Sequence, residues 1–178
     1  MRKLSMEELG RKSVEEFRRS EKFPIVIVLE NIRSAYNVGS VFRTSDAFLI
    51  EAIYIVGYSA KPPHKEIKKT ALGAEETVSW KYFKTSPEAV GSLKDEGYNV
   101  YAAEQTEGSY KLNAIGFEPS EKIAVVFGNE VTGVEQNTIA LCDGCLEIPQ
   151  LGMKHSLNIA TAVGVVLWEL VRTRIQND

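Results

Sequence analysis

The chain has 178 residues, enough for one domain with a sizeable core, and its 44% hydrophobic and 25% charged residues match globular averages. A formal net charge of −3 argues against a protein that coats nucleic acid through bulk positive charge, although a local basic patch is compatible with it. The N-terminus has no apolar segment of the signal-peptide kind, and two cysteines cannot build a disulfide framework, so we expect a reducing, cytoplasmic setting.

Residues 1–22 are expected to form a basic helix that precedes the main domain, residues 23–178. Ser5-Met6-Glu7-Glu8 has the form of a capping box with Ser5 as N-cap, which predicts a helix that runs to about Ser20. Its dense positive charges are equally consistent with a solvated helix and with an arm that contacts phosphate groups. These charges are Arg11, Lys12, Arg18, Arg19 and Lys22.

From Phe23 onward, strands and helices alternate, which predicts an α/β domain with a mainly parallel sheet flanked by helices. The β-branched run 23–29 is typical of a strand covered on both faces. A polar loop over residues 31–36, a helix from Asn37 through Phe48 and a strand over residues 52–57 complete a βαβ unit. Further strands are expected at 77–83, 98–103, 123–127 and 146–148, and further helices at 86–96 and 134–141.

The segment 61–69 contains four lysines together with His64 and the dipeptide Pro62-Pro63. Prolines and charged residues without an apolar period are typical of loops. We therefore expect a flexible basic loop near the end of the sheet at which the second strand finishes.

Cys142 and Cys145 form a C-x-x-C pair. A zinc site would need a second pair of ligands, and a redox pair would open a helix after a strand. Because Asp143-Gly144 between the cysteines predicts a turn, we expect neither a metal site nor a redox site.

The end of the sequence combines an irregular loop with an apolar helix. Pro149 and Gly152 predict the loop, and nearly continuous apolar residues from Ser156 onward predict a buried helix. The apolar run is shorter than the roughly 20 residues of a membrane span. A buried helix has no need of Asn158 in its first turn unless this residue caps the helix or binds something.

Three loops follow strand ends, which is where open α/β sheets bind their ligands. They cover residues 30–43, 127–133 and 148–158. None contains the glycine pattern of a dinucleotide-binding fold or the Lys-Ser/Thr of a P-loop, so neither of these classes is supported. Taken alone, Arg43 is as readily an exposed residue paired with Asp46, and Glu130 is more often a structural carboxylate.

Together, the three loops resemble the three motifs of the SpoU (TrmH-type) RNA ribose 2′-O-methyltransferases, a branch of the SPOUT superfamily. The motifs read Asn37-x-Gly39 with Arg43, then Phe127-Gly128-x-Glu130-x-x-Gly133, then Ile148-Pro149-x-x-Gly152-x-x-x-Ser156-Leu157-Asn158. The resemblance runs from about Phe23 to Arg174. The chain departs from the family pattern at Leu49, where Gly is common, and in residues 33–36, which lack the usual Pro.

The resemblance implies a C-terminal deep trefoil knot and a homodimer built through the knot region and the last helix. It also implies that S-adenosylmethionine is the cofactor and that no metal takes part. The residues implied to contact the cofactor are Ala103, Gly128, Ile148 and Leu157. Gly128 and Gly152 would let the backbone approach this ligand closely.

The implied reaction is methylation of a ribose 2′-hydroxyl of RNA, with tRNA favoured over rRNA. The family assigns activation of the hydroxyl to Arg43. Because an arginine stays protonated, we expect it to hold a phosphate and stabilise the emerging alkoxide. Asn37 and Asn158 would keep Arg43 and the ribose in register, supported by Ser156 and Glu130.

Two alternatives compete with this interpretation. An inactive, knotted RNA-binding module would be expected to lack Arg43 or Asn158, and both are present. A related enzyme that methylates a base is the other alternative, and the Ser156-Leu157-Asn158 signature speaks for ribose instead.

Overall fold

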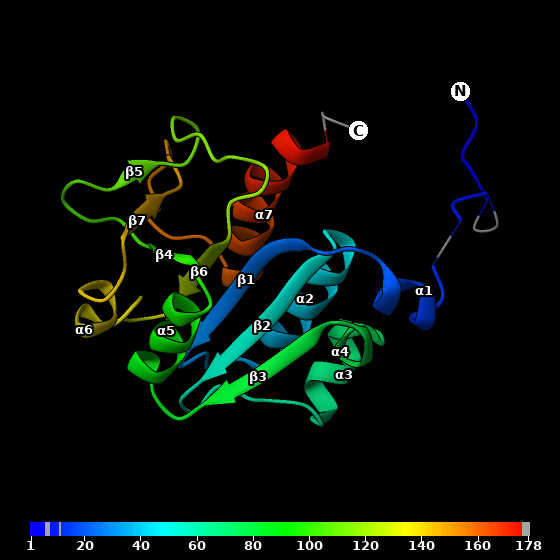
Figure 1. Ribbon diagram of the computed structural model, residues 1–178, viewed down its shortest axis with the longest axis horizontal. Helices are drawn as coiled ribbons and strands as arrows, with labels where there is room; N and C mark the ends of the chain where they lie inside the picture. The colour runs from blue at the N-terminus through cyan, green and yellow to red at the C-terminus, as the bar shows by residue number, and fades with distance from the viewer. Residues whose placement is uncertain (6–7, 11, 176–178) are drawn as a thin grey trace.

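The computed structural model describes residues 1–5, 8–10 and 12–175. Within these residues, one sheet of seven strands has the order β3-β2-β1-β6-β4-β7-β5, and all of its neighbouring strands pair in parallel (Figure 1). The strands are β1 (Phe23–Glu30), β2 (Ile50–Val56), β3 (Ser79–Phe83), β4 (Asn99–Ala103), β5 (Tyr110–Lys111), β6 (Ile123–Phe127) and β7 (Gly144–Glu147). The predicted parallel α/β architecture is therefore confirmed.

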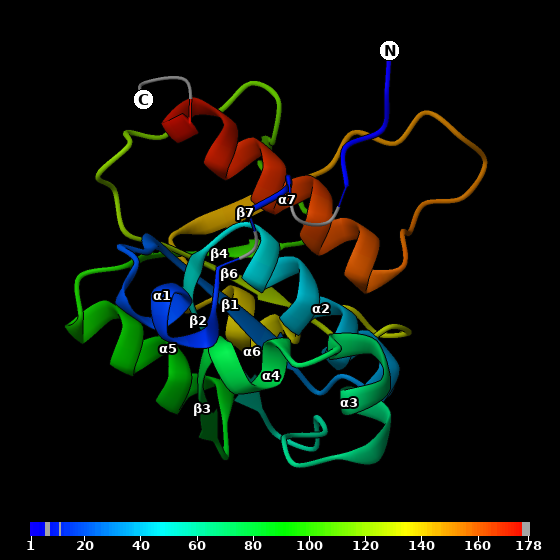
Figure 2. The ribbon, with the colours of Figure 1, turned by 90° about the vertical axis from the view of Figure 1, so that its right-hand side faces the viewer.

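Helices cover both faces of this sheet (Figure 2). They are α1 (Val14–Arg19), α2 (Ala35–Ala47), α3 (Lys65–Ala71), α4 (Ala74–Thr77), α5 (Ser86–Asp95), α6 (Gln136–Ile139) and α7 (Ile159–Ile175). Buried side chains of α2, α3, α4 and α7 form one core with the sheet, and those of α5 form a second core on the opposite face.

Strand β1 shows why the sheet is covered twice. Ile25, Ile27 and Leu29 belong to the core under α2 and α7, whereas Val26 and Val28 belong to the core under α5. Successive side chains of a strand point to opposite faces, so an unbroken apolar run can only be satisfied by two layers of helices. The prediction for residues 23–29 is confirmed.

The N-terminal helix is shorter than predicted. Ser5 and Glu8 do exchange the hydrogen bonds of a capping box, but residues 8–10 form a turn and helix α1 begins only at Val14. A second capping box at Ser13 starts it. Met6, Glu7 and Arg11 lie outside the described residues. The predicted start at Ser5 is wrong, because a capping box specifies only its own turn.

Four other elements differ from expectation. Residues 65–71 form helix α3 where a flexible loop was predicted, because the Nδ1 atom of His64 accepts from the N–H of Glu66 and caps the helix. Helix α2 begins at Ala35, inside the predicted polar loop, since the hydroxyl of Ser34 caps it. Helix α4 and strand β5 were not predicted.

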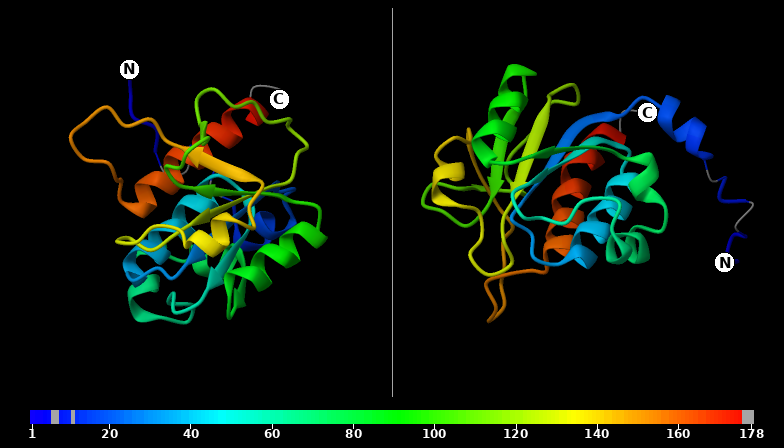
Figure 3. Two further views of the ribbon diagram at one scale, coloured as in Figure 1. Left: turned by 90° about the vertical axis from the view of Figure 1, so that its left-hand side faces the viewer. Right: turned by 90° about the horizontal axis from the view of Figure 1, so that it is seen from below.

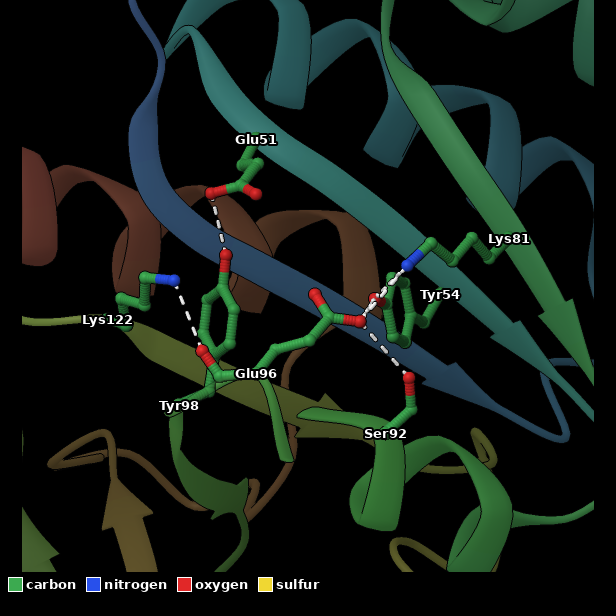
Figure 4. Close-up of polar contacts among 7 residues, drawn as sticks. All are labelled: Glu51, Tyr54, Lys81, Ser92, Glu96, Tyr98 and Lys122. Carbon is green, nitrogen blue, oxygen red and sulfur yellow. Dashed lines mark hydrogen bonds and ion pairs between the residues drawn. The ribbon is translucent and has the colours of Figure 1, made fainter. Parts of the chain in front are cut away.

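The face under α5 carries a polar cluster that joins this helix to the sheet (Figure 4). One carboxylate oxygen of Glu96 accepts hydrogen bonds from Tyr54, Lys81 and Ser92 at 3.1–3.2 Å. The hydroxyl of Tyr98 donates to Glu51 at 2.6 Å. These contacts anchor the C-terminal end of α5 on β2 and β3, away from the loops described below.

Candidate functional site

A cavity of about 460 Å³ lies where β4, β6 and β7 end, within the 300–1,000 Å³ or so that is usual for small-molecule sites. Its walls come from residues 103–106, 127–134, 146–150 and 155–157, together with the start of α7. The segment between β7 and α7 projects from the body of the molecule beside it (Figure 3). Two of the three predicted loops therefore meet around one cavity at the carboxyl edge of the sheet.

The four residues expected to contact a cofactor all line this cavity. Ala103 ends β4, Gly128 follows β6, Ile148 follows β7, and Leu157 precedes α7. For Gly128 the structure adds a second reason for glycine to the expected approach of a ligand. A Cβ atom on Gly128 would lie 2.1 Å from the carbonyl carbon of Gly133, so glycine is required here because the loop folds back on itself.

A chain of hydrogen bonds links the three motif loops. The side-chain amide of Asn158 donates to Oδ1 of Asn37 at 3.2 Å. The side-chain amide of Asn37 donates to the carboxylate of Glu130 at 2.9 Å. Glu130 also accepts from the backbone N–H groups of Arg33 at 2.9 Å and Ser34 at 3.1 Å. Residues up to 121 positions apart in sequence are thereby held in one arrangement.

The surroundings of Glu130 keep it ionised. Burial would raise its pKa, but the hydrogen bonds from the Arg33 N–H and from Asn37 outweigh this effect, so the pKa lies below the ordinary value. A carboxylate of this kind accepts hydrogen bonds and is poorly suited to donating or taking up protons near neutrality. Glu130 is therefore positioned to organise motif one.

Asn158 performs two tasks at once. Its Oδ1 atom accepts from the N–H groups of Ala160 at 2.9 Å and Thr161 at 3.4 Å, which is the pattern of a helix N-cap. Its amide nitrogen is the donor to Asn37. Both readings suggested by the sequence, a cap and a binding role, are thus represented in a single side chain.

Arg43 and Ser156 are not joined to this hydrogen-bond chain. Ser156 lines the cavity as an exposed residue. Arg43 is exposed and lines a different groove, between α2, α4 and the N-terminal segment. It lies six residues after Asn37, a rotation of about 240° along an α-helix, so the two side chains leave α2 in different directions. Within one chain, Arg43 does not reach the cavity wall.

The structure adds residues that sequence reasoning missed. Asn129 donates to the carbonyl of Asn31 at 2.9 Å and to the hydroxyl of Tyr58 at 2.7 Å, while its Oδ1 caps the turn that follows. Glu104 accepts from the N–H of Val134 at 3.2 Å and lines the cavity. An Asn directly after a strand is a signal for side-chain capping of a turn, whereas nothing in the sequence distinguishes Glu104.

The composition of the cavity fits a cationic ligand with an apolar part. Glu104, Glu130 and Glu147 line it, whereas no lysine or arginine of the described residues does so. Leu146 and Ile148 provide apolar wall. Carboxylates at close range favour a positive charge, and apolar walls favour the flat face of an aromatic base. S-adenosylmethionine, with a sulfonium and an adenine, has both properties.

The cysteines lie elsewhere and are free thiols. Burial raises the pKa of Cys142 to about 12, which leaves the thiol protonated and a poor metal ligand. The described residues contain no group of three or more His, Cys, Asp or Glu side chains arranged to hold a metal ion. They also contain no helix long and apolar enough to cross a membrane.

Comparison with known proteins points to one family. Residues 24–168 match the sequence model of the SpoU rRNA Methylase family. The chain is 31% identical over 172 residues to the tRNA (guanosine(18)-2′-O)-methyltransferase of Thermus thermophilus, an alignment that covers 95% of this chain and 85% of that protein. It is 28% identical over 172 residues to the 23S rRNA (guanosine-2′-O-)-methyltransferase RlmB of Vibrio cholerae, covering 96% of this chain and 68% of that protein.

Solved structures share the fold. The TrmH/SpoU tRNA modifying enzyme of A. aeolicus superposes with a TM-score of 0.81 at 21% identity, covering 92% of this chain and 82% of that one. An AdoMet-bound rRNA methyltransferase from Sinorhizobium meliloti superposes with a TM-score of 0.79 at 24% identity, covering 88% and 60%. With the three motif loops linked by hydrogen bonds and the family match spanning most of the sequence, the chain belongs to the SpoU rRNA methylase family.

Proposed function

We propose that this chain methylates the 2′-hydroxyl of a ribose in RNA, with S-adenosylmethionine as the methyl donor. The observation that carries the proposal is the hydrogen-bond chain from Glu130 through Asn37 to Asn158 beside the acidic cavity. The relatives to which most of this chain aligns are named as tRNA and rRNA 2′-O-methyltransferases. Methyl transfer from S-adenosylmethionine to RNA explains both the cavity, as the cofactor site, and the motif loops, as the site of the ribose.

When bound, S-adenosylmethionine supplies a methyl group on a positively charged sulfur. We propose that Ala103, Gly128, Ile148 and Leu157 hold it, largely through backbone groups and apolar contact. The three carboxylates of the cavity favour its positive charge. A reaction in which opposite charges disappear would be favoured if the bound RNA and cofactor displace water from the cavity.

Asn37 and Asn158 are proposed to hold the acceptor ribose in register, with Ser156 at the cavity rim as a further hydrogen-bond partner. Both amides are already fixed by their own hydrogen bonds, so little freedom is lost when RNA binds. Arg43 is proposed to hold the adjacent phosphate and to stabilise the alkoxide as it forms. A planar, permanently charged guanidinium suits both tasks.

A homodimer is proposed because Arg43 does not reach the cavity of its own chain. The exposed apolar residues of α7 and the preceding loop form a candidate interface: Trp168, which is 55% exposed, with Leu151, Met153, Leu157 and Val165. Helix α2 lies directly beside α7, since the rings of Phe48 and Trp168 are 6.4 Å apart. A second chain seated on this face would bring its cavity close to Arg43.

The C-terminal trefoil knot remains part of the proposal. Its support is the strand order, in which β7 follows β6 in the chain but lies on the far side of β4. This order takes the chain past β4 between β6 and β7, and we propose that it also crosses the connection into β6 on its way to α7. We also propose a cytoplasmic location, where RNA substrates are available, and tracing a tagged protein by microscopy would test it.

The activity test is methylation of cellular RNA by the purified protein, followed by nucleoside mass spectrometry. We expect 2′-O-methylated nucleosides. Methylated bases alone, or no methylation of any RNA, would contradict the proposal, and the second result would favour an inactive RNA-binding module.

A preference for tRNA over rRNA is proposed from the Thermus thermophilus relative, which is named as a tRNA methyltransferase. Mapping the 2′-O-methyl sites lost on gene deletion would decide between the two substrates.

The dimer test mixes two inactive variants. R43A should bind S-adenosylmethionine normally in calorimetry, because Arg43 is outside the cavity, yet lose turnover. I148W should fill the cavity and lose cofactor binding. Mixing them should restore about a quarter of the wild-type rate, because half of the dimers would carry one intact site. A mixture with no activity would show that Arg43 acts within its own chain, and an R43A protein that is active by itself would show that Arg43 does not act at all.

A further inference from the structure

A second cavity, about 450 Å³, lies between α3, α4 and β3 and shares no residue with the first. Its walls include Pro62, Pro63, His64, Lys65, Lys68 and Trp80. None of these residues takes part in the motif loops. The basic segment singled out in the sequence is therefore an ordered surface around a cavity, and it needs an explanation of its own.

Trp80 provides the floor of this cavity. The indole is half-buried and packs against the core beneath α2 and α3 while also lining the cavity. His64 stands at the start of α3, where its Nδ1 atom is occupied by the N–H of Glu66. Two rigid prolines continue the wall. Flat aromatic surface held in place by packing is what a nucleobase stacks on.

Positive charge surrounds the opening. Lys65 and Lys68 are exposed and, among the described residues, neither forms an ion pair. Lys61 lies over the ring of Tyr82 at 3.6 Å, and Lys69 lies 5.8 Å from the ring of Tyr36. Lysines of the segment 61–69 thus lie beside aromatic rings of β3 and α2, and lysines combined with aromatic rings can follow a single-stranded backbone and its bases.

The opposite wall is acidic. Glu75 and Glu76 line the cavity across from the lysines. One oxygen of Glu75 accepts from the N–H of Gly73 at 3.0 Å, which fixes the position of the carboxylate. A carboxylate accepts hydrogen bonds from the amino and imino N–H groups on the edge of a base. Phosphate alone would be repelled by this wall, so the cavity favours a base over an inorganic anion.

We propose that this second cavity binds one unpaired nucleotide of a single-stranded RNA segment, with its base against Trp80 and its flanking phosphates on Lys65 and Lys68. The inference rests on the proposed function, because it assumes an RNA substrate. A base inside a duplex cannot enter, so the site selects loops or ends of RNA.

The position of the second cavity relative to the motif loops is fixed by close packing. A Cβ on Gly39 would lie 2.1 Å from the hydroxyl oxygen of Thr70 and 2.4 Å from the carbonyl oxygen of Ile67, so α2 and α3 touch backbone to backbone. The Thr70 hydroxyl donates to the carbonyl of Tyr36 at 2.9 Å. A nucleotide held by α3 therefore has a set spacing from Asn37, the neighbour of Tyr36 on α2.

The chain has two tryptophans, which permits a direct measurement. In W168F only Trp80 fluoresces, and in W80F only Trp168 does. Titration of W168F with a short single-stranded oligocytidylate should quench the emission, while a blunt RNA duplex should not. W80F should show no comparable quenching. Equal quenching of W168F by the duplex, or by polyglutamate, would reveal a general charge effect and overturn the proposal.

Two double variants, each lacking two lysines, distinguish binding at this cavity from binding elsewhere on the surface. K65A/K68A should weaken oligocytidylate binding and lower the slope of log K against log salt by about 1.4, since each lost phosphate contact on a single strand removes about 0.7. K94A/K111A removes the same charge from α5 and β5, on the far face and the opposite edge of the sheet, and should leave the slope unchanged. Equal losses in both pairs would refute the assignment.

The outcomes distinguish this inference from the proposed function. Methylation of RNA by the wild-type protein without quenching of Trp80 would overturn the second site and leave the activity intact. Quenching that depends on Lys65 and Lys68 without any methylation would support the second site and contradict the proposed activity.

Discussion

At the scale of single residues, Asn158 connects the folding of the last helix to the geometry of the site. Its oxygen caps α7 and its nitrogen holds Asn37. Helix N-caps are typically worth about 1 kcal/mol, so the cap alone would explain an Asn here. The hydrogen bond to Asn37 explains why this position needs Asn and not another capping residue. Asp and Ser cap equally well but cannot donate that amide hydrogen.

The variant N158D separates these two tasks. An aspartate keeps the cap, so the melting temperature should stay close to that of the wild type. It loses the donor and presents a carboxylate to Oδ1 of Asn37, so methylation should fall by about tenfold, which is near the upper end of what one hydrogen bond between neutral groups contributes. Calorimetry and a methylation assay measure the two effects. Full activity at unchanged stability would show that only the cap matters and that the amide donor is not needed.

Glu130 gives a prediction about pH. Because its pKa is lowered in the folded protein, its contribution to stability is fully present above the ordinary glutamate pKa of 4.5 and is lost as the pH falls through the lower folded value. E130Q should therefore melt below the wild type near neutrality, and the gap should close on acidification. Thermal melts across this pH range measure it. A gap that is constant with pH would mean that the charge of Glu130 plays no part.

Some of the site residues were predictable, and others were not. Asn158 was identified because a polar side chain interrupts an apolar run. The placement of Arg43 was missed because the motif gives only the spacing along the chain, whereas two residues six positions apart on an α-helix face different sides of it. Helix α2 begins at Ala35, two residues earlier than predicted. Nothing in the sequence points to Glu104, because its side chain is held by a hydrogen bond from the N–H of Val134, 30 residues later in the chain.

At the scale of elements, the packing of α2 on α3 depends on one glycine. In the sequence Gly39 appears as part of motif one, and the structure shows that its missing side chain lets two helices meet at backbone distance. Since α3 carries Lys65 and Lys68 and α2 carries Asn37, this contact sets the spacing between the two proposed binding surfaces.

Two glycine substitutions form a matched pair. G39A places a Cβ against the backbone of Ile67 and should destabilise the protein by about 1–3 kcal/mol, as overpacking does. G91A, in α5, meets no atom within 4 Å and should stabilise by about 0.5–1 kcal/mol, because alanine restricts the unfolded chain. Urea unfolding measures both. Similar effects of the two variants would show that helix propensity alone governs these positions.

Elements were predicted best where periodicity was strong. Strand β1 and strand β6 carry unbroken apolar runs and were found within a residue of their bounds. Helix α3 was missed because its residues 65–71 are mostly polar, and its existence depends on the His64 cap and on burial of Ile67 against α2. Strand β5 has only two residues and is a strand only because it pairs with β7. A pairing between distant segments leaves no pattern in the local sequence.

At the scale of the whole molecule, α7 has one buried side and one apolar side that faces solvent. Val163, Val166, Leu167 and Leu170 are fully buried, whereas Trp168 is 55% exposed. From the sequence alone, we could not assign these residues to the core or to an interface, because apolar residues occupy both kinds of position. Exposed apolar surface on this scale is typical of an interface between chains.

W168E tests the proposed homodimer. A charge in the middle of an apolar interface should convert dimers to monomers and abolish methylation, while the fold is retained. L141E adds the same charge to an exposed apolar residue after α6 and should leave the dimer intact. Light scattering and circular dichroism measure mass and fold. A wild-type protein that is monomeric at micromolar concentration would contradict the proposal.

The hydrogen bonds between the motif loops also have a consequence for how the protein acquires its activity. The partners Asn37 and Asn158 are 121 residues apart, and Asn37 and Glu130 are 93 apart. Contacts this distant in sequence form only after the intervening chain has collapsed around the sheet, because each requires closure of a long loop. No excised fragment can therefore reproduce the site. During refolding, turnover should return in a single late phase, at the same rate as the native structure of the whole domain. The recovery of enzymatic activity would then measure the completion of folding.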